Sequence, residues 1–154
     1  MKRILTCLVL VAWGSVFGCE SVDNSEAMRT EIQGLVKQFA EAAQKDVTAM
    51  LVMYDPGPGA ASISNGQIER GMEAIRKSAD QNLVGTQGKM KIDLGSIDVT
   101  SLGHGYALSV TPFALTETTS SLFSPQRKGV STLVWKQTPQ GWRVIHEHES
   151  YQPL

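Results

Sequence analysis

Two pairs of ionisable residues alternate near the end of this 154-residue chain and are its strongest candidates for chemistry. They are His146 and His148, and Glu147 and Glu149. Because successive side chains of a β-strand point to opposite faces, the histidines would share one face and the glutamates the other. Two histidines could supply half of a metal site. Two neighbouring carboxylates could form an acid–base pair, since their mutual repulsion raises one pKa.

Plainer interpretations of both pairs compete with these. A metal site would need a third ligand, and His104 lies far along the chain in a predicted turn, so we favour structural or interface histidines and expect no metal and no cofactor. The glutamates could simply be solvated at a cavity mouth or be bound by an arginine, and we favour that interpretation too. Ser131 and Ser150 have no histidine–acid pair at suitable positions, which excludes nucleophilic catalysis.

The element that must position these residues is a predicted hairpin of two long strands. Its first strand includes Gly129–Lys136, a turn follows at 138–141, and its second strand runs from Trp142 to Ser150. Both faces of the second strand mix apolar and polar residues. The alternation alone favours Trp142 and Val144 as the inward residues, which would put both glutamates outside.

The preceding elements are expected to be mainly helical and then β-stranded. Apolar spacing predicts helices over 26–44, 47–54 and 71–83, with Asp46 capping the second. A small hairpin over 60–68 turns at Asn65-Gly66. From residue 89 the period becomes 2, with a bulge predicted at Gly95-Ser96, a turn at 103–105, an irregularity at Pro112 and a polar loop over 118–126. This order predicts an α+β fold, a cone-shaped barrel in which three N-terminal helices pack on a curved antiparallel sheet.

The N-terminus is expected to be an export signal, not part of the domain. A basic start and an apolar run end in Val16-Phe17-Gly18-Cys19, which resembles a bacterial lipobox. We therefore predict a lipoprotein signal peptide over 1–18, lipidation of Cys19, a tether over 19–25 and a domain over 26–151. An ordinary secretory signal with an incidental cysteine is the alternative. The lipoprotein signal predicts a bacterial cell-envelope location, with a lipid anchor in a membrane and the domain facing the periplasm or exterior.

Charge and cysteine content restrict the partners. The net charge of −1 gives no broad basic surface, so we expect no nucleic acid as partner. Cys7 lies within the predicted signal, so the mature chain would hold one cysteine and no internal disulfide.

Three stretches resemble one known superfamily. They are Met53–Gly57, Glu69-Arg70-Gly71, and Ser131–Trp135 followed by Gly141-Trp142 and His146–Ser150. Together they resemble the nuclear transport factor two-like superfamily, in particular its SnoaL-like branch and the association domain of calcium/calmodulin-dependent protein kinase. The resemblance extends over about residues 26–150 and implies a cavity between helices and sheet. It does not imply one activity, because this fold serves both enzymes and assembly modules.

The resemblance also implies an orientation opposite to that of the alternation. It places Leu133, Trp135, Ile145, Glu147 and Glu149 toward the cavity, and both histidines on the outer face, where relatives pair as dimers. The positions that resemble the arginines of the kinase domain hold Ser109, Leu133 and Glu149, so an anion site is not expected. The small hairpin lacks the carboxylate of the isomerase branch, and the first helix lacks its tyrosine.

We therefore expect a membrane-anchored, noncatalytic SnoaL-like domain that binds a small, largely apolar or cationic molecule in its cavity. We expect it to form a homodimer through the sheet face carrying His146 and His148. An isomerase- or cyclase-type enzyme with Glu147 or Glu149 as general base is one alternative, and a structural oligomerisation module is another. Aromatic side chains could line the pocket or belong to the core. The expected ligand-binding residues are Phe39, Tyr54, Ser109, Leu133, Trp135, Ile145, Glu147 and Glu149.

Overall fold

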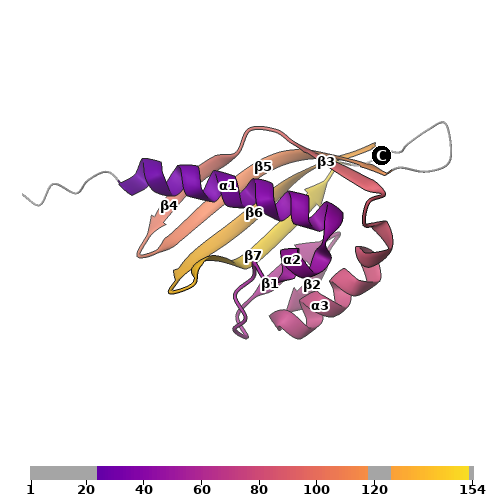
Figure 1. Ribbon diagram of the computed structural model, residues 1–154, viewed down its shortest axis with the longest axis horizontal. Coiled ribbons are helices and arrows are strands. Elements are labelled where there is room, and N and C mark those ends of the chain that lie inside the picture. Colours follow the sequence, from indigo (N-terminus) through magenta and orange to yellow (C-terminus); the bar gives the residue numbers. More distant parts are fainter. Residues whose placement is uncertain (1–23, 118–125, 153–154) are drawn as a thin grey trace, which may run out of the picture.

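The computed structural model describes residues 24–117 and 126–152 (Figure 1). The predicted signal peptide, Cys19 and nearly all of the tether lie outside these ranges, as does almost all of the polar loop predicted over 118–126. Within them, no helix is both long and apolar enough to cross a membrane.

Three α-helices form where the apolar spacing predicts them. They are α1 (Asn24–Lys45), α2 (Val47–Leu51) and α3 (Gly71–Asn82), followed by a short 3₁₀ turn, η1 (Val84–Thr86). Asp46 caps α2 by accepting a hydrogen bond from the Ala49 amide at 3.1 Å, as predicted. The second helix ends earlier than the predicted residue 54, because Met53 and Asp55 exchange backbone hydrogen bonds with Val144 instead.

The strands form one open sheet with the order β2-β1-β7-β6-β5-β3, and β4 also pairs with β5. The long strands are β5 (Tyr106–Glu117), β6 (Gln126–Thr138) and β7 (Gly141–Tyr151), all antiparallel. The small hairpin, β1 (Ala61–Ser64) and β2 (Gln67–Arg70), turns at Asn65-Gly66, where both residues have positive φ as a two-residue hairpin turn requires.

One pairing departs from the antiparallel sheet that the sequence predicts. β1 lies parallel to β7, with Ser62 opposite Glu147 and Ser64 opposite Glu149, so the sheet is mixed. Strand periodicity cannot reveal this pairing, because it joins segments about 85 residues apart. The α+β class with helices on a curved sheet is confirmed.

The bulge predicted at Gly95-Ser96 is instead a break between two strands. β3 (Met90–Leu94) and β4 (Asp98–Gly103) pair with different halves of β5. Between them, the Gly95 amide donates to the Pro112 carbonyl at 2.7 Å. Pro112 therefore stands in β5 where its neighbouring strand is interrupted.

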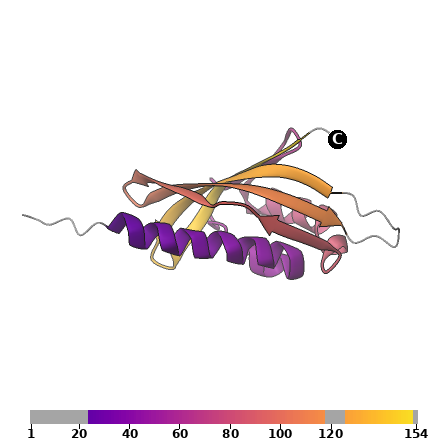
Figure 2. The same cartoon turned by 90° about the horizontal axis from the view of Figure 1, so that it is seen from above.

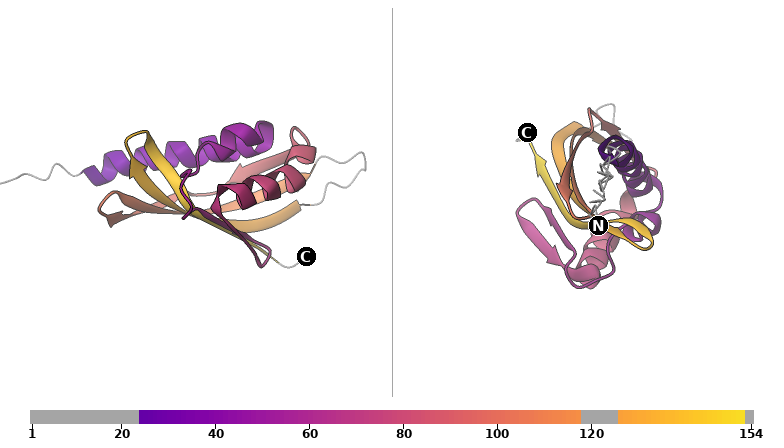
Figure 3. Two further views of the ribbon diagram at one scale, coloured as in Figure 1. Left: turned by 90° about the horizontal axis from the view of Figure 1, so that it is seen from below. Right: turned by 90° about the vertical axis from the view of Figure 1, so that its left-hand side faces the viewer.

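The hydrophobic core lies between the helices and the concave face of the sheet (Figure 2). α1 runs along this face and supplies Ile32, Val36 and Phe39, while the sheet supplies fully buried Trp135 and Val144. Seen along α1, the sheet curls around the helices, which occupy one side of it (Figure 3). At the end of the cone near α3 the core gives way to a cavity.

Candidate functional site

A β-bulge in β7 decides which side chains face the cavity. Val134 pairs with His146, whereas Trp135 pairs with Val144, so Ile145 is an extra residue in the ladder. The alternation therefore changes phase at Ile145. Trp142 and Val144 are buried before the bulge, and Glu147 is buried after it. The two conflicting predictions for this strand are each correct on one side of Ile145.

Two rows of residues cross the inner face beyond the bulge. In the first, β-ladder partners place Ser109, Leu133, Glu147 and Ser62 side by side. In the second they place Thr111, Ser131, Glu149 and Ser64 side by side. Each glutamate therefore has a serine of β1 as its neighbour on one side, and further polar residues of β5 and β6 lie in the same two rows.

Glu147 lies at the centre of this region, with only 8% of its surface exposed. Its Oε2 atom accepts hydrogen bonds from the Tyr54 hydroxyl and, at 2.8 Å, from the Ser62 hydroxyl. Burial raises the pKa of Glu147 to about 7, and the charge on Glu149 adds to the rise, while the two hydrogen bonds oppose it. Glu147 is therefore poised to exchange a proton near neutral pH.

Tyr54 is positioned by backbone and ring contacts. It forms a parallel β-bridge with Val144, and its ring packs against Phe39 with centroids 5.7 Å apart. Burial and the charge on Glu147 raise the pKa of Tyr54 well above its ordinary value, so its hydroxyl remains a hydrogen-bond donor.

The second carboxylate has a tyrosine of its own. The Tyr151 hydroxyl donates to Glu149 Oε2 at 2.8 Å. Burial raises the pKa of Glu149, while this hydrogen bond and the charge of Arg127 oppose the rise. Arg127 lies over the Tyr151 ring, 5.3 Å from its centroid, and also binds Glu117 at 2.7 Å.

A glycine makes the position of Tyr151 possible. Gly129 stands opposite both Phe113 and Tyr151, whose rings meet edge to face 5.5 Å apart across it. A Cβ atom on Gly129 would lie 2.8 Å from the Phe113 ring and 2.5 Å from the Ser150 carbonyl. Only glycine therefore fits without displacing the aromatic pair.

These groups border a cavity of about 440 Å³. Its apolar wall comes from the three helices, β3 and β5, and its polar wall from β1, β2, β6 and β7. Four of the predicted ligand-binding residues line it: Phe39, Tyr54, Glu147 and Glu149.

The other four predicted residues do not line the cavity. Ser109, Leu133 and Trp135 are buried in the inner layer of the sheet, where Trp135 Nε1 donates to Ser109 Oγ at 2.9 Å. Ile145 occupies the bulge. Whether any of these four residues contacts a ligand stays a prediction.

Sequence reasoning missed several polar residues of the cavity. Ser62, Glu69 and Tyr151 are not among the residues that the sequence predicts to border the cavity. Glu69 and Tyr151 have no local signal for this role, because the parallel pairing of β1 with β7 and the curl of the sheet bring them in. The sequence also favours Arg127 or Arg143 as the partner of Glu147 or Glu149. Arg127 instead pairs with Glu117, and Arg143 donates to the Trp142 carbonyl.

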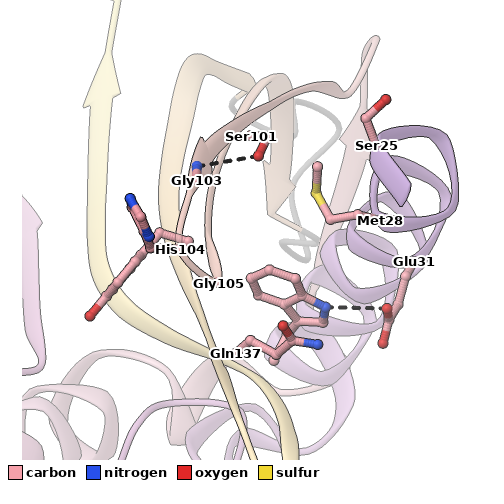
Figure 4. Close-up of a pocket in the computed structure, with 10 residues that line it drawn as sticks. Ser25, Met28, Glu31, Ser101, Gly103, His104, Gly105 and Gln137 are labelled. Carbon is pink, nitrogen blue, oxygen red and sulfur yellow. Dashed lines mark hydrogen bonds between the residues drawn. The ribbon is translucent and has the colours of Figure 1, made fainter. Parts of the chain in front are cut away.

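A second hollow lies at the opposite end of α1 (Figure 4). It has a volume of about 340 Å³ and is bordered by the first turns of α1 and the turn at His104. Trp142 Nε1 donates to Glu31 Oε2 there at 3.2 Å. No acidic or basic side chain that lines this hollow is buried. It therefore has no counterpart of Glu147 that could serve as an acid or base.

His146 and His148 lie on the outer face of β7, with His148 exposed. Among the residues that the structure describes, no three metal-ligating side chains come together as a metal site would require.

Solved structures share this fold at low sequence identity. A nuclear transport factor 2-like superfamily protein from Salmonella enterica superimposes with a TM-score of 0.71 at 20% identity, covering 84% of this chain and 94% of that one. The association domain of CaMKII from C. elegans superimposes with a TM-score of 0.69 at 16% identity, covering 83% of this chain and 99% of that one. A candidate dehydratase of the NTF2-like family from Streptomyces avermitilis superimposes with a TM-score of 0.74 at 16% identity, covering 84% of this chain and 99% of that one.

These likenesses establish the cone-shaped NTF2-like fold. The search of curated proteins found no match. The sequence itself carries the family assignment. The model of the SnoaL-like domain matches residues 32–154, which include every residue around the cavity described above. The chain therefore belongs to the SnoaL-like domain family.

Proposed function

We propose that this chain binds a small molecule in the cavity over Glu147. The observation that carries the proposal is a carboxylate at 8% exposure that borders about 440 Å³ of space instead of a packed core. Burying an ionisable group costs free energy unless it is paired, and Glu147 has hydroxyl partners but no cation among the described residues. A ligand that pairs with it would offset that cost.

The test is native mass spectrometry of the full chain extracted in a non-ionic detergent. We expect a small molecule to co-purify, and the Ser78→Phe variant to lose it, because Ser78 lines the cavity and a phenyl ring there would take up space that the ligand needs. Gln81→Phe is the matched control, since Gln81 is exposed on the same helix and outside the cavity. An empty wild-type protein, or equal occupancy in both variants, would contradict the proposal.

A second candidate function is proton transfer with Glu147 as the general base. The observation that favours it is the pKa of Glu147 of about 7, which suits a base working near neutral pH. Once the bound molecule is identified, incubation in D₂O distinguishes a proton-transfer enzyme from a domain that only binds the molecule. A proton-abstracting enzyme exchanges a C–H of its ligand for C–D, and Glu147→Gln abolishes the exchange, whereas a binding domain shows no exchange in either form.

The location that we propose is a membrane surface, reached through lipid on Cys19. The support is the lipobox-like sequence ending at Cys19. Intact-mass measurement should find acyl chains on the mature N-terminus, and Cys19→Ser should release the protein from the membrane fraction. An unmodified N-terminus would leave an ordinary export signal as the explanation.

We further propose that two copies pair through the outer face of the sheet. Apolar side chains gather on that face, among them exposed Val130 and Ile68 and partly exposed Val110. The fold is also that of the CaMKII association domain, a likeness that keeps a purely structural assembly role as the alternative. A cavity that never binds a ligand would favour that alternative.

A further inference from the structure

The charges around the cavity are strongly unbalanced. Its lining includes four carboxylates, on Glu69, Glu117, Glu147 and Glu149, but one cationic side chain, Arg127. Arg127 is already bound to Glu117 at 2.7 Å. Its charge also acts on Glu149, so this one cation serves four carboxylates, and Glu69 and Glu147 have no cation among the described residues. An anionic ligand would be repelled.

The hydrogen-bonding capacity of the cavity is unbalanced in the same direction. Both hydroxyl donors of Glu147 bind its Oε2 atom, and no described residue donates to Oε1. Glu149 likewise accepts from Tyr151 at Oε2 only. The cavity thus presents acceptor atoms that lack donors. A ligand that brings N–H donors would satisfy them, whereas one that brings acceptors would not.

The opposite wall of the cavity is apolar. Phe39, Met50, Ile75 and Leu115 line it, each buried in the core. A hydrocarbon group buried against them would stabilise the complex, because its apolar area is removed from water. The cavity therefore combines one apolar wall with one acidic wall.

We propose that the ligand of this cavity is an organic ammonium ion, a protonated amine whose apolar body lies against α1 and α3 and whose N–H groups donate to Glu147 and Glu149. This inference rests on the proposed function and narrows it to one ligand class. It also assigns both glutamates to ligand binding in their ionised form.

Binding of an ammonium ion should release protons. Tyr54, Glu69 and Glu149 face Glu147, and Arg127 and Tyr151 face Glu149; Arg127 is the cation among these groups. With the cavity empty, Glu147 is about half protonated at pH 7, since its pKa is about 7. An ammonium ion stabilises the carboxylate, so binding should expel on the order of half a proton at that pH.

Isothermal titration calorimetry of the full chain in non-ionic detergent tests the inference with three probes of similar size. They are 2-phenylethylammonium, the neutral 2-phenylethanol and the anionic phenylacetate. We expect the ammonium to bind at least tenfold more tightly than the alcohol, since hydrogen bonds to charged groups are the stronger ones, and phenylacetate to bind least. Titration in phosphate and in Tris at pH 7 should give different heats, because the two buffers take up the released protons with different enthalpies of protonation.

Variants assign the effect to the named carboxylates. Glu147→Gln should weaken ammonium binding roughly tenfold or more and leave binding of the alcohol within about twofold. Glu73→Gln, at an exposed position of α3 outside the cavity, removes the same formal charge and should leave all three affinities unchanged.

The outcomes separate this inference from the proposed function. If the alcohol or phenylacetate binds as tightly as the ammonium, or if Glu147→Gln does not discriminate between probes, the ligand class is wrong although the cavity binds small molecules. If the ammonium does not bind at millimolar concentration, the inference is overturned, and the molecule that co-purifies decides the proposed function by itself.

Discussion

Glu147 is held between opposing effects, and burial prevails. Two hydroxyl donors stabilise its ionised form, yet desolvation and the charge of Glu149 raise its pKa to about 7. Selection for stability alone would favour a neutral side chain at this position, because burial in the core does not stabilise a carboxylate. The free-energy cost of burying Glu147 has a functional reason if its carboxylate binds a ligand.

The first prediction concerns stability and pH. The folded pKa of Glu147 lies above its ordinary value of 4.5, so between about pH 4.5 and 7 the folded state holds a proton that the unfolded chain has released. Its contribution to stability is therefore present at low pH and is lost as pH rises through about 7. The Glu147→Gln variant has no carboxyl group to titrate at this position and should not lose this stability. We therefore expect its free energy of unfolding, relative to that of the wild type, to increase by up to roughly 3 kcal/mol from pH 5 to pH 8.

Urea denaturation of both proteins at the two pH values measures this difference. Glu73→Gln on α3 controls for the removal of a charge from the surface. The same difference between variant and wild type at both pH values would mean that Glu147 is not held in its neutral form by the fold.

The second prediction concerns the donor on Tyr54. Tyr54→Phe removes a hydrogen bond to the ionised form of Glu147 and preserves the ring contact with Phe39. We expect the midpoint of the Glu147 titration, followed by ¹³C NMR of its carboxyl carbon, to move upward by roughly one pH unit. Ser62→Ala removes the other donor and should move it in the same direction. A downward movement in either variant would show that these hydroxyls do not stabilise the carboxylate.

At the scale of elements, one extra residue in β7 serves two needs. Before the bulge at Ile145, the strand buries Trp142 and Val144 beneath α1; after it, the strand turns Glu147 and Glu149 into the cavity. A regular strand could not do both, because residues 142, 144, 146 and 148 would share one face.

The third prediction follows from this phase change. Deletion of Ile145 removes the extra residue, so Val134 and Trp135 can keep His146 and Val144 as partners in a regular strand, and Glu147 keeps its inward face. What is lost is the bend that a bulge gives its strand. We expect the sheet to curl less over the helices, the free energy of unfolding to fall by about 3 kcal/mol and small-molecule binding to weaken. Ile145→Ala keeps the bulge and, at a partly exposed position, should cost about 1 kcal/mol. Thermal unfolding of both variants measures the difference, and equal stabilities would mean that the fold does not need the bend at this bulge.

At the scale of the whole molecule, the helices cover one face of the sheet and leave the other open (Figure 3). The fourth prediction tests whether a second copy covers that face. Val130→Asp places a charge on that face and should shift sedimentation velocity profiles toward the monomer at micromolar concentration. Val52→Asp is the matched control, because Val52 is exposed at the end of α2 and belongs to no strand of the sheet. A wild-type protein that already sediments as a monomer would contradict the proposed pairing.

Local sequence determined most of the elements of this protein. The apolar spacing of α1 and α3, the cap at Asp46, the Asn65-Gly66 turn and the two-residue connection between β6 and β7 all follow from short-range physics, so they were predictable. The shared face of Glu147 and Glu149 was predictable for the same reason, since it needs only the period of a strand.

Tertiary structure alone decided which residues contact the face of β7 that carries Glu147 and Glu149. The bulge at Ile145 depends on the register with β6, Ser62 reaches Glu147 through a parallel pairing over 85 residues, and Tyr54 reaches it over 93. Such contacts depend on the free energy of packing the whole sheet against the helices, and no local period encodes them. The sequence therefore determined which groups could carry chemistry, and the fold decided that they meet around a cavity.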